Sequence, residues 1–341
     1  MVKTGNNFED LSKSMLKELS GRARDVIERR FGIGSRSKKQ TLESIGGLYK
    51  ITRERVRQIE AAAIGKIRNS EVFSASKELF ADLEKEFNLR DKVWREDEVL
   101  AHFAGNDSGK NYVYFFLSLG RPFERIGADN EFYHRWTNDA AGVAEVEKTI
   151  KNFCRGLGEE PLNREEIADK FKKHVESDLS RKISADAVFS WLGVSKNINS
   201  NNFGEWGLTS SPLVKPSGMR DFAYLVLRKH GSPLHFREVA SRIEGLANKR
   251  AHVQTVHNEL IKDRRFVLVG RGLYALASWG YQPGTVKDII KSILEKQGPS
   301  SKEELVKLVK QERHVKDNTI FINLQNKARF KRLPDGRFHV A

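Results

Sequence analysis

The stretch TLESIGGLYKITRERVRQIE, residues 41–60, predicts two short helices separated by a tight turn. Thr41 and Thr52 are residues of the type that caps a helix, and each precedes apolar residues at helical spacing. The predicted inward positions are Leu42, Ile45 and Leu48 in the first helix and Val56, Ile59, Ala63 and Ile67 in the second. Two helices joined in this way form a helix-turn-helix, in which the second helix can enter the major groove of DNA.

The outward face of the second predicted helix carries side chains that can read bases. Those within its first turn and a half are Arg53, Glu54, Arg57 and Gln58. Arginine can bind guanine through two hydrogen bonds, glutamine can pair with adenine, and glutamate can accept from cytosine. The cations that point elsewhere and suit phosphate groups are Arg55, Lys66 and Arg68. A solvated charged face on an ordinary helix is the alternative interpretation.

The residues around this motif carry a family resemblance. Residues 19–33, LSGRARDVIERRFGI, followed by residues 41–68, TLESIGGLYKITRERVRQIEAAAIGKIR, resemble region 4 of the primary sigma factors of bacterial RNA polymerase. The TRERVRQIE core is highly specific to that family. The resemblance implies a promoter −35 element whose bases are contacted by Arg53, Glu54 and Gln58 and whose backbone is contacted by Arg55 and Arg57. It also implies a protein partner, the flap of the polymerase β subunit.

The chain departs from the family pattern at three points. Lys50 stands in the turn where the family usually has glycine, and a positive φ there costs another residue about 1 kcal/mol. Gly47 could relax the turn instead. Residues 35–40, SRSKKQ, are more basic than the linker expected at that place. Nothing resembles region 2, which melts the −10 element, so we do not expect a complete sigma factor.

The composition predicts an anionic partner. Lysine and arginine number 60 against 45 aspartates and glutamates, which gives a formal net charge of +15. Nucleic acid is the first expectation for such a chain, and an anionic membrane is the second. The sequence lacks an apolar run of about 18 residues and a signal peptide pattern at its start. We therefore expect a bacterial cytoplasmic protein that associates with the nucleoid and not with a membrane.

The motifs of catalysis and metal binding are weak throughout. The single cysteine, Cys154, excludes an intrachain disulfide and a multi-cysteine zinc site, and its helical context predicts burial. Residues 105–110, GNDSGK, are one residue short of a phosphate-binding loop, and Asn111 replaces the residue that holds magnesium. The histidines are scattered along the chain. We expect no enzymatic activity, no cofactor and no bound metal.

A pattern recurs four times behind the first domain. Each copy has an acidic amphipathic helix, a second helix, and an aromatic strand pair with a glycine or asparagine turn. The aligned apolar residues of the first helices are Val99, Ile167, Val239 and Leu305. The aromatic residues expected to pack beneath the strand pairs are Trp136, Trp206, Tyr274 and Phe338. Such an order, with a preceding helix, is typical of a winged helix.

The third copy resembles the HARE-HTH family of winged helices in PLHFREVA, residues 233–240, and GRGLYAL, residues 270–276. The resemblance implies an association with DNA or transcription. We expect the first two copies to be scaffold and the last two to contact DNA, although protein binding is the alternative for each. The predicted contacts are Arg250, Gln254, Lys262, Arg264 and Arg271, followed by Lys316, Asn323, Lys327, Arg329 and Arg337.

The sequence therefore predicts a mainly α protein with small β hairpins, in which an N-terminal helix-turn-helix precedes tandem winged-helix domains. The predicted segments are a helix-turn-helix at 1–69, a connecting helix at 70–87, and four winged-helix copies at 88–140, 141–216, 217–282 and 283–341. The predicted function is DNA binding in transcription, with recognition of a promoter-like element and contact with RNA polymerase. The alternatives are a polymerase accessory subunit that acts through protein contacts and a DNA-binding component of a restriction-type system.

Overall fold

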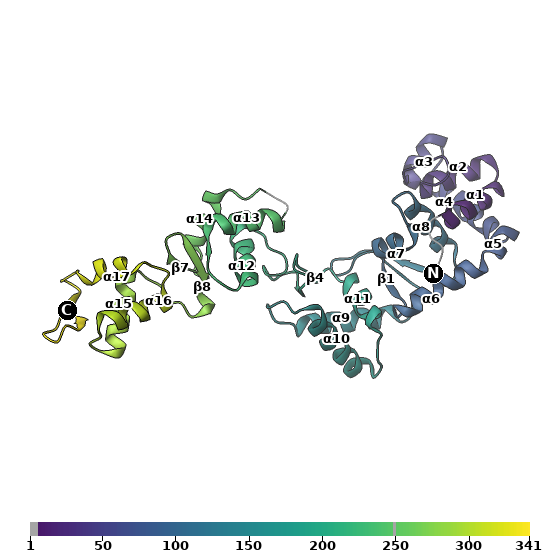
Figure 1. Cartoon of the computed structure of the whole chain (residues 1–341). Helices are drawn as coiled ribbons and strands as arrows, with labels where there is room; N and C mark the ends of the chain where they lie inside the picture. Colours follow the sequence, from purple (N-terminus) through teal and green to yellow (C-terminus); the bar gives the residue numbers. More distant parts are fainter. Residues whose placement is uncertain (1–5, 248–249) are drawn as a thin grey trace. The chain divides into compact units, whose positions relative to one another are not determined.

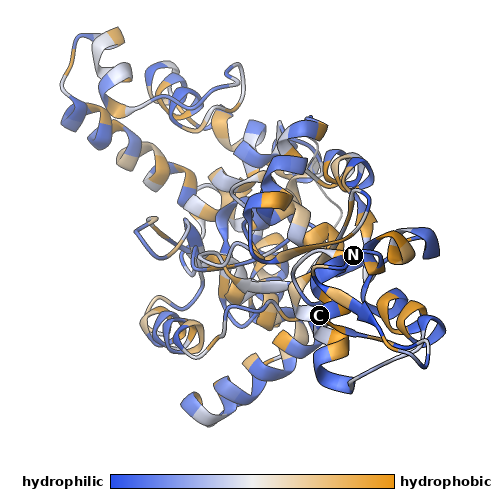
Figure 2. Ribbon diagram, turned by 90° about the vertical axis from the view of Figure 1, so that its left-hand side faces the viewer, coloured by the Kyte–Doolittle hydropathy of each residue, from blue (hydrophilic) through white to orange (hydrophobic). Residues whose placement is uncertain are grey.

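The computed structural model describes residues 6–247 and 250–341. The chain divides into two compact units, Met1–Ser210 and Ser211–Ala341 (Figure 1). The fold is mainly helical, with small antiparallel strand pairs, as the sequence predicts. Orange and blue segments alternate along the helices in Figure 2, as expected where each helix buries one side. The finer division of the chain into six segments stays a prediction.

The first four helices are α1 (Asn6–Lys17), α2 (Gly21–Phe31), α3 (Leu42–Tyr49) and α4 (Arg53–Arg68). The last two are the predicted helix-turn-helix. Both predicted caps are confirmed, because the Thr41 hydroxyl accepts from the Ser44 amide at 3.1 Å and the Thr52 hydroxyl accepts from the Arg55 amide at 3.2 Å. Each threonine thus satisfies an amide that the helix itself leaves without a partner.

The predicted single helix over residues 70–87 is two helices, α5 (Glu71–Ala75) and α6 (Lys77–Leu89). Ser76 separates them, and its hydroxyl donates back to the Val72 carbonyl at 2.8 Å. A serine that bonds to the preceding turn competes with continuation of the helix. The buried residues of α6 are Leu79, Leu83 and Phe87, so this helix belongs to the core.

The first copy of the repeat follows the order helix, strand, helix, helix, hairpin. Its elements are α6, β1 (Val93–Arg95), α7 (Glu96–Ala104), α8 (Gly109–Leu119), β2 (Glu124–Ile126) and β3 (Arg135–Thr137). The strands form an antiparallel sheet in the order β1-β3-β2. The second copy has α9 (Val143–Arg155), α10 (Arg164–Leu179), α11 (Ala185–Val194), β4 (Ile198–Ser200) and β5 (Trp206–Leu208). Its first strand is reduced to one antiparallel bridge between Leu162 and Trp206.

The unit Ser211–Ala341 contains the other two copies. The third copy has α12 (Met219–His230), β6 (Leu234–His235), α13 (Phe236–Ala247), α14 (Val253–Lys262), β7 (Phe266–Gly270) and β8 (Leu273–Leu276), with sheet order β6-β8-β7. A 3-10 turn, Ala277–Trp279, follows. The fourth has α15 (Val286–Gln297), α16 (Lys302–Glu312), α17 (Asp317–Leu324), β9 (Phe330–Arg332) and β10 (Phe338–Val340). A bridge between Ser300 and Phe338 takes the place of its first strand.

The apolar positions that the sequence aligns across the four predicted copies are all buried. The aligned residues Val99, Ile167, Val239 and Leu305 are each 0% exposed. The aromatic residues of the terminal strands are at least partly buried against the copies' cores, as predicted for Trp136, Trp206, Tyr274 and Phe338. Cys154 is buried on α9, and burial raises the pKa of its thiol to about 11. The cysteine therefore acts as an apolar filler.

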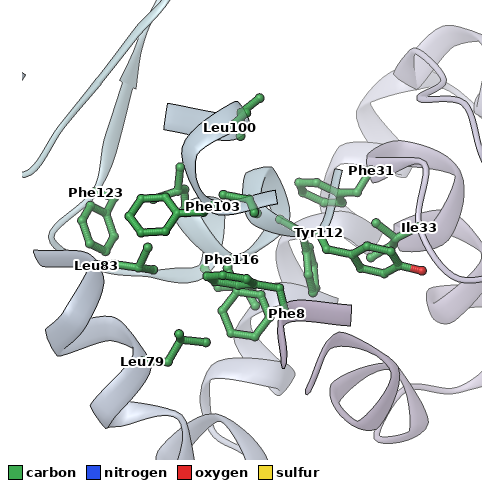
Figure 3. Close-up of a cluster of buried hydrophobic side chains, with 14 of the residues drawn as sticks. Phe8, Phe31, Ile33, Leu79, Leu83, Leu100, Phe103, Tyr112, Phe116 and Phe123 are labelled. Carbon is green, nitrogen blue, oxygen red and sulfur yellow. The ribbon is translucent and has the colours of Figure 1, made fainter. Parts of the chain in front are cut away.

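One hydrophobic core joins the N-terminal helices to the first copy. The ring of Phe8 on α1 meets the edges of Phe103 and Phe116 at centroid distances of 6.2 and 5.2 Å, and Phe31 on α2 meets Phe115 at 5.0 Å. Figure 3 shows rings from α1, α2, α7 and α8 gathered in this cluster. The apolar sides of α1 and α2 are thus covered by the chain's own helix α8.

Neither a membrane span nor a metal cluster is found within the described ranges. None of the helices described is both long and apolar enough to cross a bilayer. No group of three or more histidine, cysteine, aspartate or glutamate side chains in residues 6–247 and 250–341 is placed to hold a metal ion.

Candidate nucleic-acid interface

The helix-turn-helix has its own small core. Val26 of α2, Ile45 of α3 and Val56 of α4 are each 0% exposed and pack together, with Ile59 against them. The prediction for Leu48 is wrong, since this side chain is 58% exposed. The inward-facing residues of α3 are Leu42, Ile45 and Tyr49. Because these residues define the buried side of the helix, position 48 lies on its outer side.

The turn between α3 and α4 depends on two neighbouring conformational features. Lys50 adopts the left-handed conformation, with φ 54° and ψ 44°, and ends α3. Gly47 therefore does not relax the turn and remains within the helix. The turn folds back over Gly46, where an added Cβ would lie 2.7 Å from the Ile51 carbonyl oxygen. The sequence argument missed this close approach, for which the Gly46-Gly47 pair beside a predicted turn was the available signal.

Polar contacts hold α2 against both helices of the motif. The Asp25 carboxylate accepts from the Tyr49 hydroxyl at 2.5 Å, from Arg29 at 2.5 Å and from Arg36 at 2.9 Å. Burial alone would raise the pKa of Asp25, but these hydrogen bonds lower it to about 2. On the other side, Arg30 pairs with Glu60 of α4 at 3.3 Å, although burial raises the pKa of Glu60. Helix α2 is therefore tied to α3 through Asp25 and Tyr49 and to α4 through Arg30 and Glu60.

The outward face of α4 presents all of the predicted base-reading residues to solvent. Arg53, Glu54, Arg55, Arg57 and Gln58 are exposed. Arg57 donates to both carboxylate oxygens of Glu54 at 2.9 and 2.7 Å, and Arg55 donates to Gln58 at 3.0 Å. The hydrogen bond from Arg57 lowers the pKa of Glu54, which keeps this acceptor charged. Within the described residues, the Arg53 side chain makes no hydrogen bond or ion pair, so its donors face solvent.

The two phosphate contacts expected in the C-terminal half of α4 are Lys66 and Arg68, and their surroundings differ. Lys66 is exposed and remains able to meet a phosphate. Arg68 differs from the expectation, because its guanidinium donates to the carbonyls of Leu119 and Ser118 at 2.9 and 3.2 Å. These carbonyls lie at the C-terminal end of α8, where a helix leaves acceptors without partners. Arg68 therefore joins α4 to α8 and is not available to DNA.

The predicted contacts of the third copy are exposed around α14. Arg250 lies just before this helix and Gln254 lies in its first turn, with its amide bonded to Asn258 at 3.1 Å. Lys262 is the last residue of α14, Arg264 follows it, and Arg271 occupies the β7–β8 turn. These cations are thus spread along the helix and the hairpin. The helix also exposes Val253 and Ile261, which are 41% and 63% exposed.

The predicted contacts of the fourth copy lie mostly outside its third helix. Only Asn323 belongs to α17, and its amide donates to the Thr319 carbonyl at 2.6 Å. Lys316 and Lys327 are exposed at the two ends of the helix. The two arginines are ion-paired, Arg329 with Asp288 at 3.0 Å and Arg337 with Asp335 at 2.7 Å.

The third helices of the first two copies are covered. No residue of α8 is exposed, and in α11 none is exposed from Ala187 onward, within the described stretch 6–247. Helix α11 packs on the first copy, where Ser190 donates to the Val93 carbonyl at 2.8 Å and the Trp191 indole donates to the Asp91 carbonyl at 3.3 Å. These two helices have structural roles in the N-terminal unit.

Comparison with known proteins finds a family match and relatives for the N-terminal segment. Residues 15–69 match the family model described as Sigma-70, region 4. This segment is a sigma-70 region 4 domain. The chain is 47% identical over 70 residues to the RNA polymerase sigma factor SigA of a Nostoc species, covering 20% of this chain and 17% of that protein. It is also 47% identical over 64 residues to the RNA polymerase sigma factor RpoD of Helicobacter pylori, covering 18% and 10%.

A third relative extends over a similar part of the chain. The RNA polymerase sigma factor SigA of a Synechocystis species is 41% identical over 78 residues, which cover 20% of this chain and 18% of that protein. The chain thus matches less than a fifth of the length of each of these relatives. The matched segment contains the whole of α2, α3 and α4, and with them the exposed face described above.

Proposed function

We propose that this protein binds duplex DNA through α4, whose N-terminal part enters the major groove. The observation that carries the proposal is the exposed face of Arg53, Glu54 and Gln58 on a region 4 segment in which Thr52 caps the start of α4. A helix presented in this way suits direct reading of bases. The net charge of +15 supplies attraction to the phosphate backbone.

Each exposed side chain has a proposed part in recognition. Arg53 has free donors and would bind a guanine. Glu54, held charged by Arg57, would accept from a cytosine amino group, and Gln58 would pair with an adenine. Arg55 and Lys66 would meet phosphates, which position the helix without reading sequence. Thr41 and Thr52 act through the helix ends that they cap, where an amide not used by the cap can also meet a phosphate.

We propose a promoter-like element as the DNA target and RNA polymerase as a protein partner, because the matched relatives are RNA polymerase sigma factors. The structure restricts how the β flap could be contacted. The apolar sides of α1 and α2 are occupied by α8, and the large apolar side chain that α3 exposes is Leu48. A polymerase contact would therefore use polar groups or Leu48. Without a segment that resembles region 2, addition of this chain to core polymerase should not give promoter melting.

We further propose that the four repeated copies are winged helices. The order of elements and the sheet orders β1-β3-β2 and β6-β8-β7 support this assignment in the first and third copies. The third copy carries the HARE-HTH resemblance as well. The buried third helices α8 and α11 support a scaffold role for the first two copies, and the exposed α14 and α17 leave the last two open to a partner.

A polymerase accessory subunit that acts through protein contacts is the second proposed function. The observation in its favour is the apolar surface of α14, where Val253 and Ile261 are exposed beside a single lysine, Lys262. Exposed apolar side chains on one helix favour a protein partner over a phosphate backbone.

Charge reversal on α4 separates the two functions. We expect Arg53→Glu combined with Arg57→Glu to abolish duplex binding in an electrophoretic mobility or anisotropy assay, because two cations become anions at the groove. Binding to core polymerase, measured with the same variant by pull-down, should persist. DNA binding that survives this charge reversal would show that the α4 face is incidental, as the accessory-subunit function requires. Circular dichroism checks that α4 remains folded.

A further inference from the structure

The fourth copy contains a pocket that the proposed function does not use. It encloses about 870 Å³ and is lined by residues of the β9–β10 hairpin, of α17 and of the first turn of α16. Five lysines or arginines line it against two acidic residues. Its apolar lining includes the rings of Phe321, Phe330 and Phe338. Concave sites of this size that combine apolar walls with a few charged groups are typical of ligand-binding pockets.

The pairing of the hairpin places a cation among these rings. Arg332 of β9 lies directly opposite Phe338 of β10. Residues two apart on a strand share a face, so Arg332 lies on the same face as Phe330, which is only 2% exposed. Arg332 is exposed and has no ion pair among the residues that the structure describes. A free guanidinium thus borders the aromatic wall of the pocket.

A second cation lies over another ring that lines the pocket. The Lys302 ammonium at the start of α16 is 3.7 Å from the centroid of the Phe321 ring. The arginine of the turn, Arg337, is held by Asp335 and contributes little free charge. The pocket therefore offers two aromatic rings, each beside a cation that can meet an anion.

The third helix of this copy lacks the chemistry for reading a duplex. The α17 sequence, DNTIFINL, contains no lysine or arginine, and its Ile322 is 59% exposed. Five cations of the fourth copy instead line the pocket. A duplex keeps its bases stacked inside and presents a convex surface, so it could not fill a concave aromatic site. An unpaired nucleotide presents both a phosphate and a flat ring.

We propose that this pocket binds unpaired nucleotides of single-stranded DNA. The base packs against Phe338 and replaces the Lys302 ammonium on the face of Phe321, and the flanking phosphates meet Lys302 and Arg332. Aromatic side chains that stack on bases, beside cations that follow the backbone, are the general means of binding single strands. The site does not involve α4, so it stands or fails independently of duplex recognition.

The test compares a fluorescein-labelled oligothymidylate with a labelled hairpin duplex, each titrated with the full-length protein at several salt concentrations. We expect Phe321→Leu, which keeps an apolar side chain but removes the ring, to weaken oligothymidylate binding by roughly tenfold. Arg332→Ala should weaken it by several-fold and make its salt dependence shallower, by roughly 0.7 in the logarithmic slope. Duplex binding should not change in either variant.

Two controls make the result decisive. Lys296→Ala removes an exposed cation of α15 that does not line the pocket, and it should leave oligothymidylate binding unchanged. Arg53→Ala should weaken duplex binding only, which separates failure at α4 from failure at the pocket. Thermal unfolding of Phe321→Leu shows whether the fourth copy is still folded. Arg332→Ala, at an exposed position, tests binding at the same pocket without altering an apolar side chain.

Three outcomes would overturn the proposal. The first is that both pocket variants bind oligothymidylate like the unchanged protein. The second is that duplex and single strand lose affinity equally, which would indicate general attraction of polyanions. The third is that polyglutamate displaces the oligothymidylate as readily as unlabelled oligothymidylate does, which would identify the pocket as a site for an acidic peptide.

Discussion

Helices α4 and α8 lie in the same compact unit, yet their surfaces have opposite character. Every residue of α8 is buried or half-buried, because α7, α1 and α2 pack against it. Helix α4 is buried along one side only and keeps Arg53, Glu54 and Gln58 in solvent. Both helices end a helix–turn–helix arrangement. The contrast teaches that this local architecture alone does not make a DNA-reading helix, since the helix must also be left uncovered.

Exposure alone is not sufficient either. Helices α14 and α17 of the C-terminal unit expose one side, but α14 has one lysine and α17 has no cation. Their exposed surfaces include Val253, Ile261 and Ile322. Duplex recognition needs both an open face and donors that match the base edges. Of the four helices compared, α4 combines the two properties to the greatest extent.

Among the tests of this contrast between α4 and the other helices, Arg53→Ala has the largest expected effect. We expect a loss of about 1–3 kcal/mol in binding free energy at a selected DNA site, with a relaxed base preference, because a bidentate contact to guanine is removed. The measurement begins with selection of bound sequences from a random DNA pool. Anisotropy titrations of the selected site and of variants with single base changes then follow.

Two lysine substitutions serve as controls for the result with Arg53→Ala. In α8, Lys110 pairs with Asp107 at 2.6 Å, and Lys110→Ala should leave DNA binding unchanged. In α4, Lys66→Ala should weaken binding to all DNA sequences equally. It should also reduce the logarithmic salt slope of binding by about 0.9, the value for one phosphate. If Arg53→Ala and Lys66→Ala behaved identically, the division between base and backbone contacts would be wrong.

The next largest effect concerns the turn between α3 and α4. Gly46→Ala places a Cβ 2.7 Å from the Ile51 carbonyl oxygen, and a backbone atom cannot move aside easily. We expect about 2 kcal/mol of destabilisation of the helix-turn-helix, measured by urea unfolding. The adjacent Gly47→Ala is the matched control, because an added Cβ there meets no described atom within 4 Å. It should stabilise α3 by about 0.5–1 kcal/mol through helix propensity. Equal effects at both positions would contradict the described turn.

The local part of this interface could be predicted from the sequence, and the tertiary part could not. The caps at Thr41 and Thr52 and the stripe through Val56 follow from spacing and residue type within one helix. The role of Arg68 depends on carbonyls about 50 residues away, which no local pattern indicates. The cover over α8 likewise requires contacts between distant segments.

The hairpin pocket escaped prediction for a related reason. Its lining comes from α16, α17 and both strands of the hairpin, so the residues meet only after the copy has folded. Phe338 was expected to pack beneath the hairpin, and it does, but the same ring also borders the pocket. The positions that the sequence aligns across the four copies are all buried, whereas the outward chemistry differs from copy to copy.

The smallest effect tests whether the family's turn glycine is needed. Lys50 takes a left-handed conformation that costs a residue with a Cβ about 1–2 kcal/mol. Lys50→Gly removes that cost but enlarges the conformational freedom of the unfolded chain, so the expected net gain is about 0.5 kcal/mol. Ser180→Gly, at another left-handed helix end with φ 52°, should give a similar gain in urea unfolding. A loss of stability in Lys50→Gly alone would mean that the lysine side chain itself supports the turn, and the departure from glycine would then be a stabilising feature of this chain.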